Sequence, residues 1–382
     1  MAARDEFESA TENAALVDLL RRRIEAEGAI TFHDFMETVL YHPTLGYYAT
    51  RQPMGREGDY LTSPEVSPIF GAIVGRELAY MWEAMGRPDP FDAVEQGAGT
   101  GRLAASILRW AALARPELSA AMRYRIVEIS DALRRKQSEV ISEGAVEWLD
   151  GLPNEIEGVV LTNELLDSFP VHRIAIEKGR LLEMYVTHED GRFDYIAAPL
   201  STPRIEAYFS ELGVRPGADC VAEVNLHAID WMTDVSTRLT RGFVLTFDYG
   251  YTAEELYAPW RKDGTLLCFY RHNASSDPFA RVGKQDMTSH VDFTSLMRAG
   301  DANGLEVAGF TTQSRFLAAL GVGEAVEAVA RESPDALEEY YARRRAVQEL
   351  IDPAGLGRIR VLAQRKGVEA TELLGFREDG GA

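Results

Sequence analysis

Apolar and polar residues follow one another along the chain in a pattern that predicts helices first and strands later. From residue 11 to 54 the spacing is helical, with one apolar face at 16–24 and a second helix at 32–40 that has Thr31 as its N-cap. A further helix is expected from about 67 to 85. The chain therefore opens with a mainly helical extension.

Short apolar segments after this extension predict the strands of a parallel sheet. One segment, at 158–164, runs apolar or β-branched with almost no polar interruption, as in a strand that is buried on both faces. Strands that alternate with helices are typical of an α/β domain with a doubly wound, Rossmann-like sheet. The predicted strands are 91–95, 124–128, 146–150, 158–164 and 242–251, with a helix at 103–113 between the first two.

The remaining segments predict insertions and further helices around this sheet, without an internal repeat or a low-complexity linker. We expect a helical extension and cofactor lid at 1–90, a core at 91–330 with substrate-side insertions at about 175–240 and 252–292, and C-terminal helices at 331–382. In detail, the pattern predicts paired strands at 171–200, mostly helix at 203–239, irregular chain at 256–292, a helix at 293–302, a strand at 305–310, helices at 315–331, 333–350 and 354–366, and a last strand at 369–376.

A glycine-rich turn follows the strand at 91–95. Glu95 precedes Gly97, Gly99 and Gly101, and glycines permit positive φ and let a ligand approach the backbone closely. A dinucleotide-binding turn needs its third glycine at the next position, which is Arg102 here. The spacing Glu-x-Gly-x-Gly-x-Gly is instead the form found in class I methyltransferases, although by itself it also fits an ordinary strand-to-helix turn.

Acidic and polar residues stand where the predicted strands end. In doubly wound sheets, ligands bind beyond the carboxyl ends of the strands, and an acid after the second strand binds the ribose hydroxyls of a nucleoside. Glu128 occupies that place, and a solvated strand-end acid is the alternative. Asp150 ends the third strand, and the polar segment 163–170 after the fourth should face the same crevice.

Composition narrows the classes of partner and cofactor. The 382 residues carry a net charge of −20, which argues against a nucleic-acid surface and favours a cationic partner. Cys220 and Cys268 form no disulfide or zinc pattern, and the seven histidines lack ligand spacing, so we expect no metal. No apolar run is long enough to span a bilayer, and the N-terminal segment is acidic, unlike a signal or transit peptide. The chain is therefore expected to be soluble, in the cytoplasm of a bacterium or, although no transit peptide is seen, in the mitochondrial matrix of a eukaryote.

Several motifs taken together resemble the MidA-like methyltransferases, a family that includes the mitochondrial assembly factor for respiratory complex I. Two residues depart from the family pattern: Ala98 replaces a proline in the turn, and Ser168 replaces an alanine. The resemblance implies a seven-stranded class I fold, S-adenosylmethionine as the cofactor, and symmetric dimethylation of an arginine on a complex I subunit. The motifs are HPTLGYY (42–48), GDYLTSPEVSPIFG (58–71), EQGAGTGRL (95–103), TNELLDSFPVHR (162–173), FDYGY (247–251) and DMTSHVDF (286–293).

The resemblance also implies roles for individual residues. Glu164 and Asp167 are the predicted catalytic pair, because two carboxylates can hold a guanidinium fork and localise its charge; in the alternative, Asp167 only caps the next helix. The lid is expected to include Glu65, which is also assigned with His290 and Asp292 to the substrate side. Cofactor binding is assigned to Glu95, Gly97, Gly99, Gly101, Glu128, Asp150 and Asn163, with Asp59, Thr62 and Pro64 in the lid.

Three other functions stay open on the sequence alone. A nicotinamide-dependent oxidoreductase could use a similar sheet, although Arg102 argues against it. A non-catalytic assembly protein could keep a cofactor pocket for stability, although the intact glycines, Glu128 and Asn163 argue against decay. A methyltransferase could also act on a small molecule or on another protein residue. The partners that we expect are a protein substrate and, less specifically, a second copy of the chain.

Overall fold

The computed structural model describes residues 12–50, 58–59, 61–324, 327, 337–369 and 372–377. The chain forms two compact units that interleave along the sequence. The first contains the described residues up to Asp59, together with 166–231 and 250–296; the second contains 61–165, 232–249 and the residues from 297 onward. This grouping cuts across the predicted ranges 1–90, 91–330 and 331–382, which stay a prediction.

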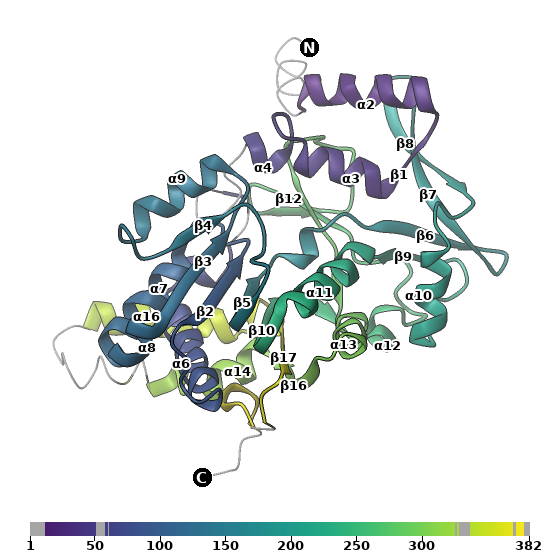
Figure 1. Ribbon diagram of the computed structural model, residues 1–382. Coiled ribbons are helices and arrows are strands. Elements are labelled where there is room, and N and C mark those ends of the chain that lie inside the picture. The colour runs from purple at the N-terminus through teal and green to yellow at the C-terminus, as the bar shows by residue number, and fades with distance from the viewer. Residues whose placement is uncertain are drawn as a thin grey trace. The chain divides into compact units, whose positions relative to one another are not determined.

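A seven-stranded sheet forms the centre of the second unit, in agreement with the predicted fold (Figure 1). In order across the sheet, the strands are β16 (Glu306–Thr312), β17 (Arg360–Lys366), β10 (Leu239–Asp248), β5 (Ile156–Asn163), β2 (Phe91–Gln96), β3 (Met122–Val127) and β4 (Glu147–Leu149). The last five strands in this order are parallel, while β17 is antiparallel to both of its neighbours, β10 and β16.

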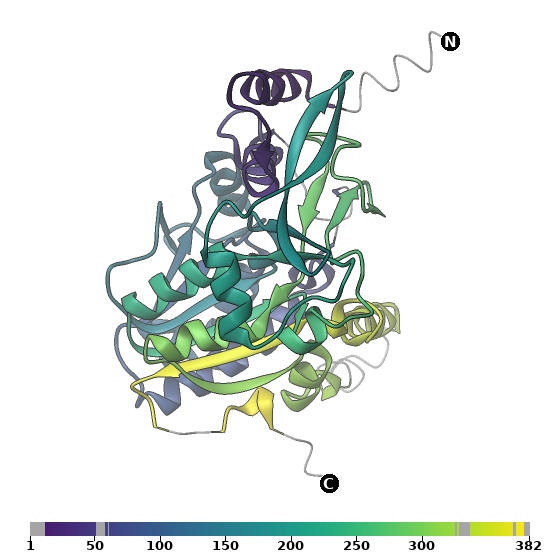
Figure 2. The same cartoon turned by 90° about the vertical axis from the view of Figure 1, so that its right-hand side faces the viewer.

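Helices cover both faces of this sheet. On one face, the ring of Phe247 in β10 contacts Phe70 of α6 (Pro68–Ala84) and Phe316 of α14 (Gln313–Ala319). On the other face, Gln364 and Lys366 of β17 donate hydrogen bonds to backbone carbonyls of α13 (Phe293–Ala302) and α11 (Leu226–Arg238). Figure 2 shows these two green helices in front of the yellow strand β17. The sheet is therefore buried on both sides, which explains its unbroken apolar strands.

The C-terminal segment corrects two of the predicted elements. The predicted helix at 354–366 is a short 3₁₀ turn, η2 (Leu356–Arg358), followed by strand β17, and the predicted strand at 369–376 contains the 3₁₀ turn η3 (Leu374–Phe376). Residues 360–366 are rich in good helix formers, but β17 forms ladders with strands on both sides. These tertiary hydrogen bonds outweigh a weak local preference.

The first unit contains a five-stranded sheet with helices packed on it. Strand order is β1 (Ile30–Thr31), β7 (Arg180–Glu189), β6 (His172–Glu177) and β9 (Val221–Val224), and β8 (Arg192–Ala198) pairs with β7. The predicted paired strands at 171–200 are thus confirmed, whereas β9 interrupts the predicted helical stretch at 203–239. Helices α2 (Ala14–Glu27) and α3 (Phe32–Tyr41) match the predicted N-terminal helices, and Thr31 caps α3 by accepting from the Asp34 amide.

The segment predicted to be irregular at 256–292 forms small strands. β12 (Leu267–Tyr270) lies between β13 (Asn273–Ser275) and β14 (Asp286–Thr288), and β15 (Val291–Asp292) pairs with β11 (Gly250–Tyr251). The predicted helix at 315–331 begins as α14, and most of its residues after 324 lie outside the part of the chain that the structure describes. The remaining elements are α4 (Tyr47–Thr50), α5 (Ser63–Val66), α7 (Arg102–Ala114), α8 (Pro116–Ala121), α9 (Asp131–Val140), η1 (Leu166–Ser168), α10 (Arg204–Leu212), α12 (Ala253–Leu256) and α16 (Leu337–Ile351).

Candidate active site

Four parallel strands of the second unit end at the same edge of the sheet, and each ends in a residue suited to binding. Gly97 follows β2, Glu128 follows β3, Glu164 follows β5, and Asp248 is the last residue of β10. Because the strands are parallel, their carboxyl ends define one edge, which is where α/β sheets bind ligands. The structure thus brings these predicted residues to one edge of the sheet, and the binding of a ligand there stays a prediction.

The glycine turn has the backbone geometry that its sequence predicts. Gly97, Gly99 and Gly101 have φ of 74°, 54° and 81°, a region that side chains disfavour. A Cβ at position 97 would also lie 2.8 Å from the end of the Leu165 side chain, which would have to move to make room for it. Gly101 is the left-handed N-cap of α7 and has no side chain to cap the helix's first amides, which could therefore bind a ligand.

The carboxylate of Glu128 is buried and held in one orientation. Its Oε1 accepts from the Ser130 amide at 2.9 Å, and its Oε2 accepts from Gln137 at 3.2 Å. Burial raises the pKa of Glu128. A carboxylate has about four acceptor sites, so it can accept two ribose hydroxyls besides these two donors. The neighbouring Ile129 is 78% exposed and offers an apolar surface to a flat base.

We expect Glu128→Ala to weaken cofactor binding without abolishing it. The ribose hydroxyls lose a charged acceptor, which is worth about 1.5–3 kcal/mol, or about 10- to 100-fold in affinity. Isothermal titration calorimetry with S-adenosylhomocysteine measures this directly. Glu147→Ala is the control, because Glu147 is exposed on the adjacent strand and its carboxylate pairs with Arg125. Wild-type affinity in Glu128→Ala would remove Glu128 from the site.

Glu164 has an unusual backbone conformation at the end of β5. Its φ is 52°, in the left-handed region that few non-glycine residues occupy. Residues with this strained conformation are often found at functional sites. Its amide donates to the Phe247 carbonyl at 2.8 Å, and its Oε1 accepts from Asn163 Nδ2 at 3.1 Å and from the Ser63 amide at 3.4 Å. The strained backbone and these contacts fix the direction of the carboxylate.

Asp248 and Ser63 support the turn at Glu164 and Leu165 that follows β5, and no function was predicted from the sequence for either of them. Asp248 accepts from the amides of Leu165 and Tyr249 at 3.2 and 2.8 Å, and it is fully buried. Ser63 donates its hydroxyl to Gln313 at 2.9 Å, which places the Ser63 amide against Glu164. The signal for Asp248 was available, since it ends a buried strand in the FDYGY motif much as Glu164 follows another. No local signal identifies Ser63 or Gln313.

The predicted lid residues of the second unit lie beside the glycine turn. Thr62 is buried at the N-terminus of α5, and Pro64 lies in its first turn. Glu65 accepts from the Thr100 hydroxyl and, through Oε2, from Arg102 Nε at 2.9 Å. Both of these contacts join α5 to the glycine turn. The assignment of Glu65 to the substrate and of Thr62 and Pro64 to the cofactor stays a prediction.

Glu95 lies in β2, two residues before the first glycine of the turn. It is buried in the sheet and accepts a hydrogen bond from the Tyr124 hydroxyl at 2.6 Å. Burial raises the pKa of Glu95 to about 7, and the bond from Tyr124 only partly opposes this shift. Glu77, on α6, is another buried acid whose pKa burial raises to about 7. A direct role of Glu95 in cofactor binding stays a prediction.

The raised pKa of Glu95 predicts a pH dependence of stability. Between the unfolded value of 4.5 and the folded value of about 7, the folded state holds a proton that the unfolded state has lost. Stability therefore falls as pH rises through this window, and Glu95→Gln should increase the free energy of unfolding above pH 7 by about 3 kcal/mol. Glu77→Gln, away from the turn, is the matched variant. Denaturant unfolding from about pH 5 to 8 measures both, and an unchanged slope in Glu95→Gln would contradict the shift.

The side chain of Asp150 points to solvent. It is 93% exposed and pairs with Arg134 at 2.5 Å, while Arg134 Nε also donates to the Glu128 carbonyl at 2.7 Å. The structure therefore connects Asp150 to the end of β3 through Arg134. Its assignment to cofactor binding stays a prediction.

Four predicted site residues belong to the first unit and contact other residues of it. Asp59 is buried and accepts from the Tyr47 hydroxyl at 2.7 Å and from the Arg271 amide at 2.7 Å. Asp292 accepts from the Tyr208 hydroxyl at 2.6 Å and from an amide of α13. Asp167 is buried in η1, so the alternative in which it caps a following helix finds no long helix there. The half-buried ring of His290 lies against Tyr251, with 5.2 Å between centroids.

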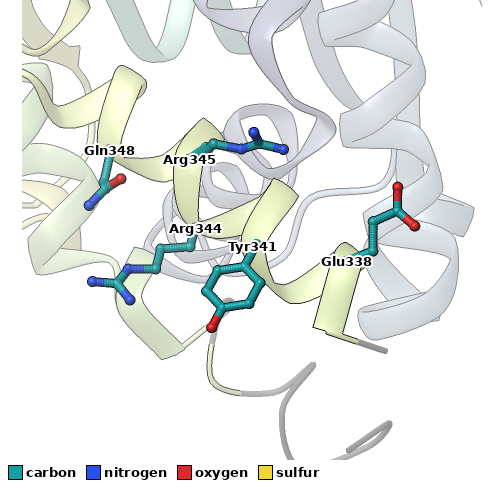
Figure 3. Close-up of a pocket in the computed structure, with 5 residues that line it drawn as sticks. All are labelled: Glu338, Tyr341, Arg344, Arg345 and Gln348. Carbon is teal, nitrogen blue, oxygen red and sulfur yellow. The ribbon is translucent and has the colours of Figure 1, made fainter. Parts of the chain in front are cut away.

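Two other places in the described chain have binding-like composition. In the first unit, ligand atoms of His33, Asp34 and Glu37 lie within 4.8 Å of one another, but Asp34 also pairs with Arg23 at 3.1 Å. In the second unit, α16 borders an open surface hollow of about 480 Å³ (Figure 3). The hollow is lined by Glu338, Tyr341, Arg344, Arg345 and Gln348. None of these is a predicted site residue.

The sheet order, the glycine turn and the strand-end acids together define a class I S-adenosylmethionine-dependent methyltransferase. Comparison with known proteins agrees: the chain belongs to a family of S-adenosyl-L-methionine-dependent methyltransferases, whose pattern matches residues 73–311.

The similar proteins align with 79–96% of the chain. The protein arginine methyltransferase NDUFAF7 homolog of Drosophila melanogaster, a mitochondrial protein, is 30% identical over 94% of this chain and 87% of its own. The mouse NDUFAF7 protein is 28% identical over 79% of this chain and 73% of its own. A crystal structure from Burkholderia thailandensis with bound S-adenosyl-homocysteine is 34% identical, with a TM-score of 0.88, and covers 96% of this chain and 95% of its own.

The residues at the sheet edge fit S-adenosylmethionine. The Oδ1 atom of Asn163 is buried and has no hydrogen-bond partner among the described residues, so a donor such as the ligand's ammonium group would satisfy it. The glycine turn would allow the amino-acid part of the cofactor to approach the backbone closely, and Glu128 with Ile129 would suit its nucleoside; these assignments stay predictions. Within the described chain, no helix is long and apolar enough to cross a membrane.

Proposed function

We propose that the protein is an arginine N-methyltransferase that acts on another protein, with Glu164 binding the acceptor guanidinium. The observation that carries the proposal is the strained backbone of Glu164, which directs a carboxylate from the carboxyl end of β5. The fly relative, which is named a protein arginine methyltransferase, aligns with 94% of the chain and supports the choice of acceptor.

The chemistry explains why a carboxylate is needed. When bound, S-adenosylmethionine would supply the methyl group of its sulfonium: in-line attack by the acceptor nitrogen would form the N–C bond, break the S–C bond to release S-adenosylhomocysteine, and free one proton from the nitrogen to solvent. A guanidinium is a poor nucleophile because its lone pairs are delocalised over three nitrogens. A carboxylate that accepts from one or two guanidinium N–H groups orients the fork and draws its positive charge away from the attacking nitrogen. In this proposal Glu164 provides that carboxylate, and Asp167 provides a second one.

The predicted acceptor is an arginine of a respiratory complex I subunit, methylated before the subunit is assembled. The resemblance to a family that includes a complex I assembly factor supports this choice, and the net charge of −20 favours a cationic segment. An arginine that is buried in an assembled complex could not enter an active site. The predicted locations, bacterial cytoplasm or mitochondrial matrix, are compatible with such a substrate, and the fly and mouse relatives are mitochondrial.

Mass spectrometry of complex I from wild-type and deletion strains tests the acceptor. The proposal expects an arginine methylation that is present in the wild type and absent in the deletion strain. Incubating the purified protein with labelled S-adenosylmethionine and a lysate of the deletion strain then identifies the labelled protein. If the methylation of complex I is identical in both strains, complex I is not the substrate. Labelling of a small molecule would refute protein arginine as the acceptor.

A further inference from the structure

Gln137 is a buried residue of α9 that contacts three segments around the candidate cofactor site. Its Nε2 donates to the Gly99 carbonyl at 3.0 Å and to Glu128 Oε2 at 3.2 Å. Its Oε1 accepts from Trp148 Nε1, on β4, at 2.8 Å. One fully buried side chain thus connects the glycine turn, the acid after β3 and the neighbouring strand β4.

These partners allow only one orientation of the Gln137 amide. The indole N–H of Trp148 can only donate, so it must face the amide oxygen. The Gly99 carbonyl can only accept, and so can the Glu128 carboxylate when it is ionised. Both must therefore face the amide NH₂ group. A flipped amide would set two acceptors against its oxygen and a donor against its nitrogen. The network therefore fixes both the side chain and its partners.

The packing of α9 against the turn adds a steric constraint. A Cβ at Gly101 would lie 3.1 Å from Gln137 Cγ and 3.2 Å from Gln137 Cα, so the helix packs closely on the turn. Gln137 therefore contacts the turn at Gly101 by packing and at Gly99 by a hydrogen bond. This combination maintains the separation between the turn, which takes the amino-acid end of the cofactor, and Glu128, which takes the ribose.

We propose that Gln137 is a positioning residue for S-adenosylmethionine, which holds Gly99 and Glu128 at the spacing that the cofactor spans. The inference rests on the proposed assignment of the turn and Glu128 to the cofactor. Gln137 acts through these two partners and does not itself contact the cofactor. Its amide is needed because it donates two hydrogen bonds from one nitrogen while its oxygen is occupied.

The substitution Gln137→Glu provides the sharpest test, because a glutamate side chain has the same shape as glutamine but donates a hydrogen bond only when protonated. Ionised groups near this position are Glu128 at the end of β3, Arg134 on α9 and Asp150 after β4. In this variant, an ionised carboxylate would oppose Glu128 and the Gly99 carbonyl. We expect S-adenosylhomocysteine affinity to fall at least about 10-fold near neutral pH and to recover towards wild type as pH falls and the new acid is protonated.

Calorimetric titration with S-adenosylhomocysteine from about pH 5 to 8 gives the readout, expressed as the ratio of variant to wild-type affinity because Glu128 also titrates. Gln137→Leu, which cannot donate at any pH, should bind weakly throughout. Gln364→Glu is the control, since Gln364 is a fully buried glutamine of β17 that donates a hydrogen bond to α13. Gln364→Glu should lose stability, but its affinity for S-adenosylhomocysteine relative to wild type should be the same across this pH range.

Any one of three results would overturn the inference. A pH-independent affinity ratio for Gln137→Glu, or wild-type binding by Gln137→Leu, would show that the amide does not position the cofactor. Wild-type binding by Glu128→Ala would instead remove the proposed site, and the inference with it. Weak binding by Glu128→Ala together with normal binding by both Gln137 variants would keep the site and refute only the role of Gln137.

Discussion

Glu164→Gln is expected to bind S-adenosylmethionine normally and to lose methyl transfer by at least about 100-fold. The amide keeps the size of the side chain, and its oxygen can still accept the hydrogen bond from Asn163 Nδ2. It carries no charge, however, and one of its two terminal atoms becomes a donor. A guanidinium would then lose its ionic partner and meet an N–H group.

The experiment separates binding from turnover. Calorimetry gives the cofactor affinity, and transfer of labelled methyl to the identified acceptor gives the rate. Glu157→Gln is the matched control, because Glu157 lies near the start of the same strand and pairs with Arg241 in an exposed position. Equal losses of affinity and rate in Glu164→Gln would assign Glu164 to the cofactor rather than to the acceptor. An unchanged rate would remove it from the chemistry.

Gly99→Val should abolish cofactor binding, with a loss of more than about 100-fold in affinity. Gly99 has φ of 54°, a conformation that a β-branched residue adopts only with strain. Its carbonyl accepts from Gln137, and the residue is buried in the turn where the cofactor must approach. Valine would therefore both distort the backbone and fill the space beside it.

Gly144→Val provides a control for backbone strain alone. Gly144 has φ of 74° in the loop before β4, and nothing lies within 4 Å of the position that its Cβ would occupy. This variant should lose some stability and bind S-adenosylhomocysteine normally. Thermal unfolding verifies that Gly99→Val is folded before its binding is measured. Normal binding by folded Gly99→Val would show that the turn does not hold the cofactor.

The sequence predicts the central part of this protein well because the relevant signals are local. A run of apolar residues that ends in glycines or an acid marks both a buried strand and the sheet edge at which ligands bind, and this rule places Gly97, Glu128 and Glu164 together. The same rule could have found Asp248, which ends β10. The fold and the approximate position of the site therefore follow from patterns within about ten residues.

Other features depend on contacts between distant segments, which leave little trace in a single sequence. Gln137 lies on a polar helix like any exposed glutamine, and only the fold brings it to Gly99 and Trp148. The Ser63 amide meets Glu164 across 101 positions of sequence. Strand β17 has a helical composition and is determined by its two neighbours in the sheet. The interleaving of the two units likewise cannot be read from periodicity.

The position of β17 has a consequence for how the protein is made. This strand is the last of the sheet in sequence, yet it lies in the interior, between β10 and β16. During synthesis, both of those strands emerge before the strand that joins them, and each has an unpaired edge in the meantime. Asp248, which supports the Glu164 turn, ends one of them. The nascent chain therefore passes through a stage in which the strands that carry the candidate site have been translated. At that stage the sheet still has open edges, which favour aggregation.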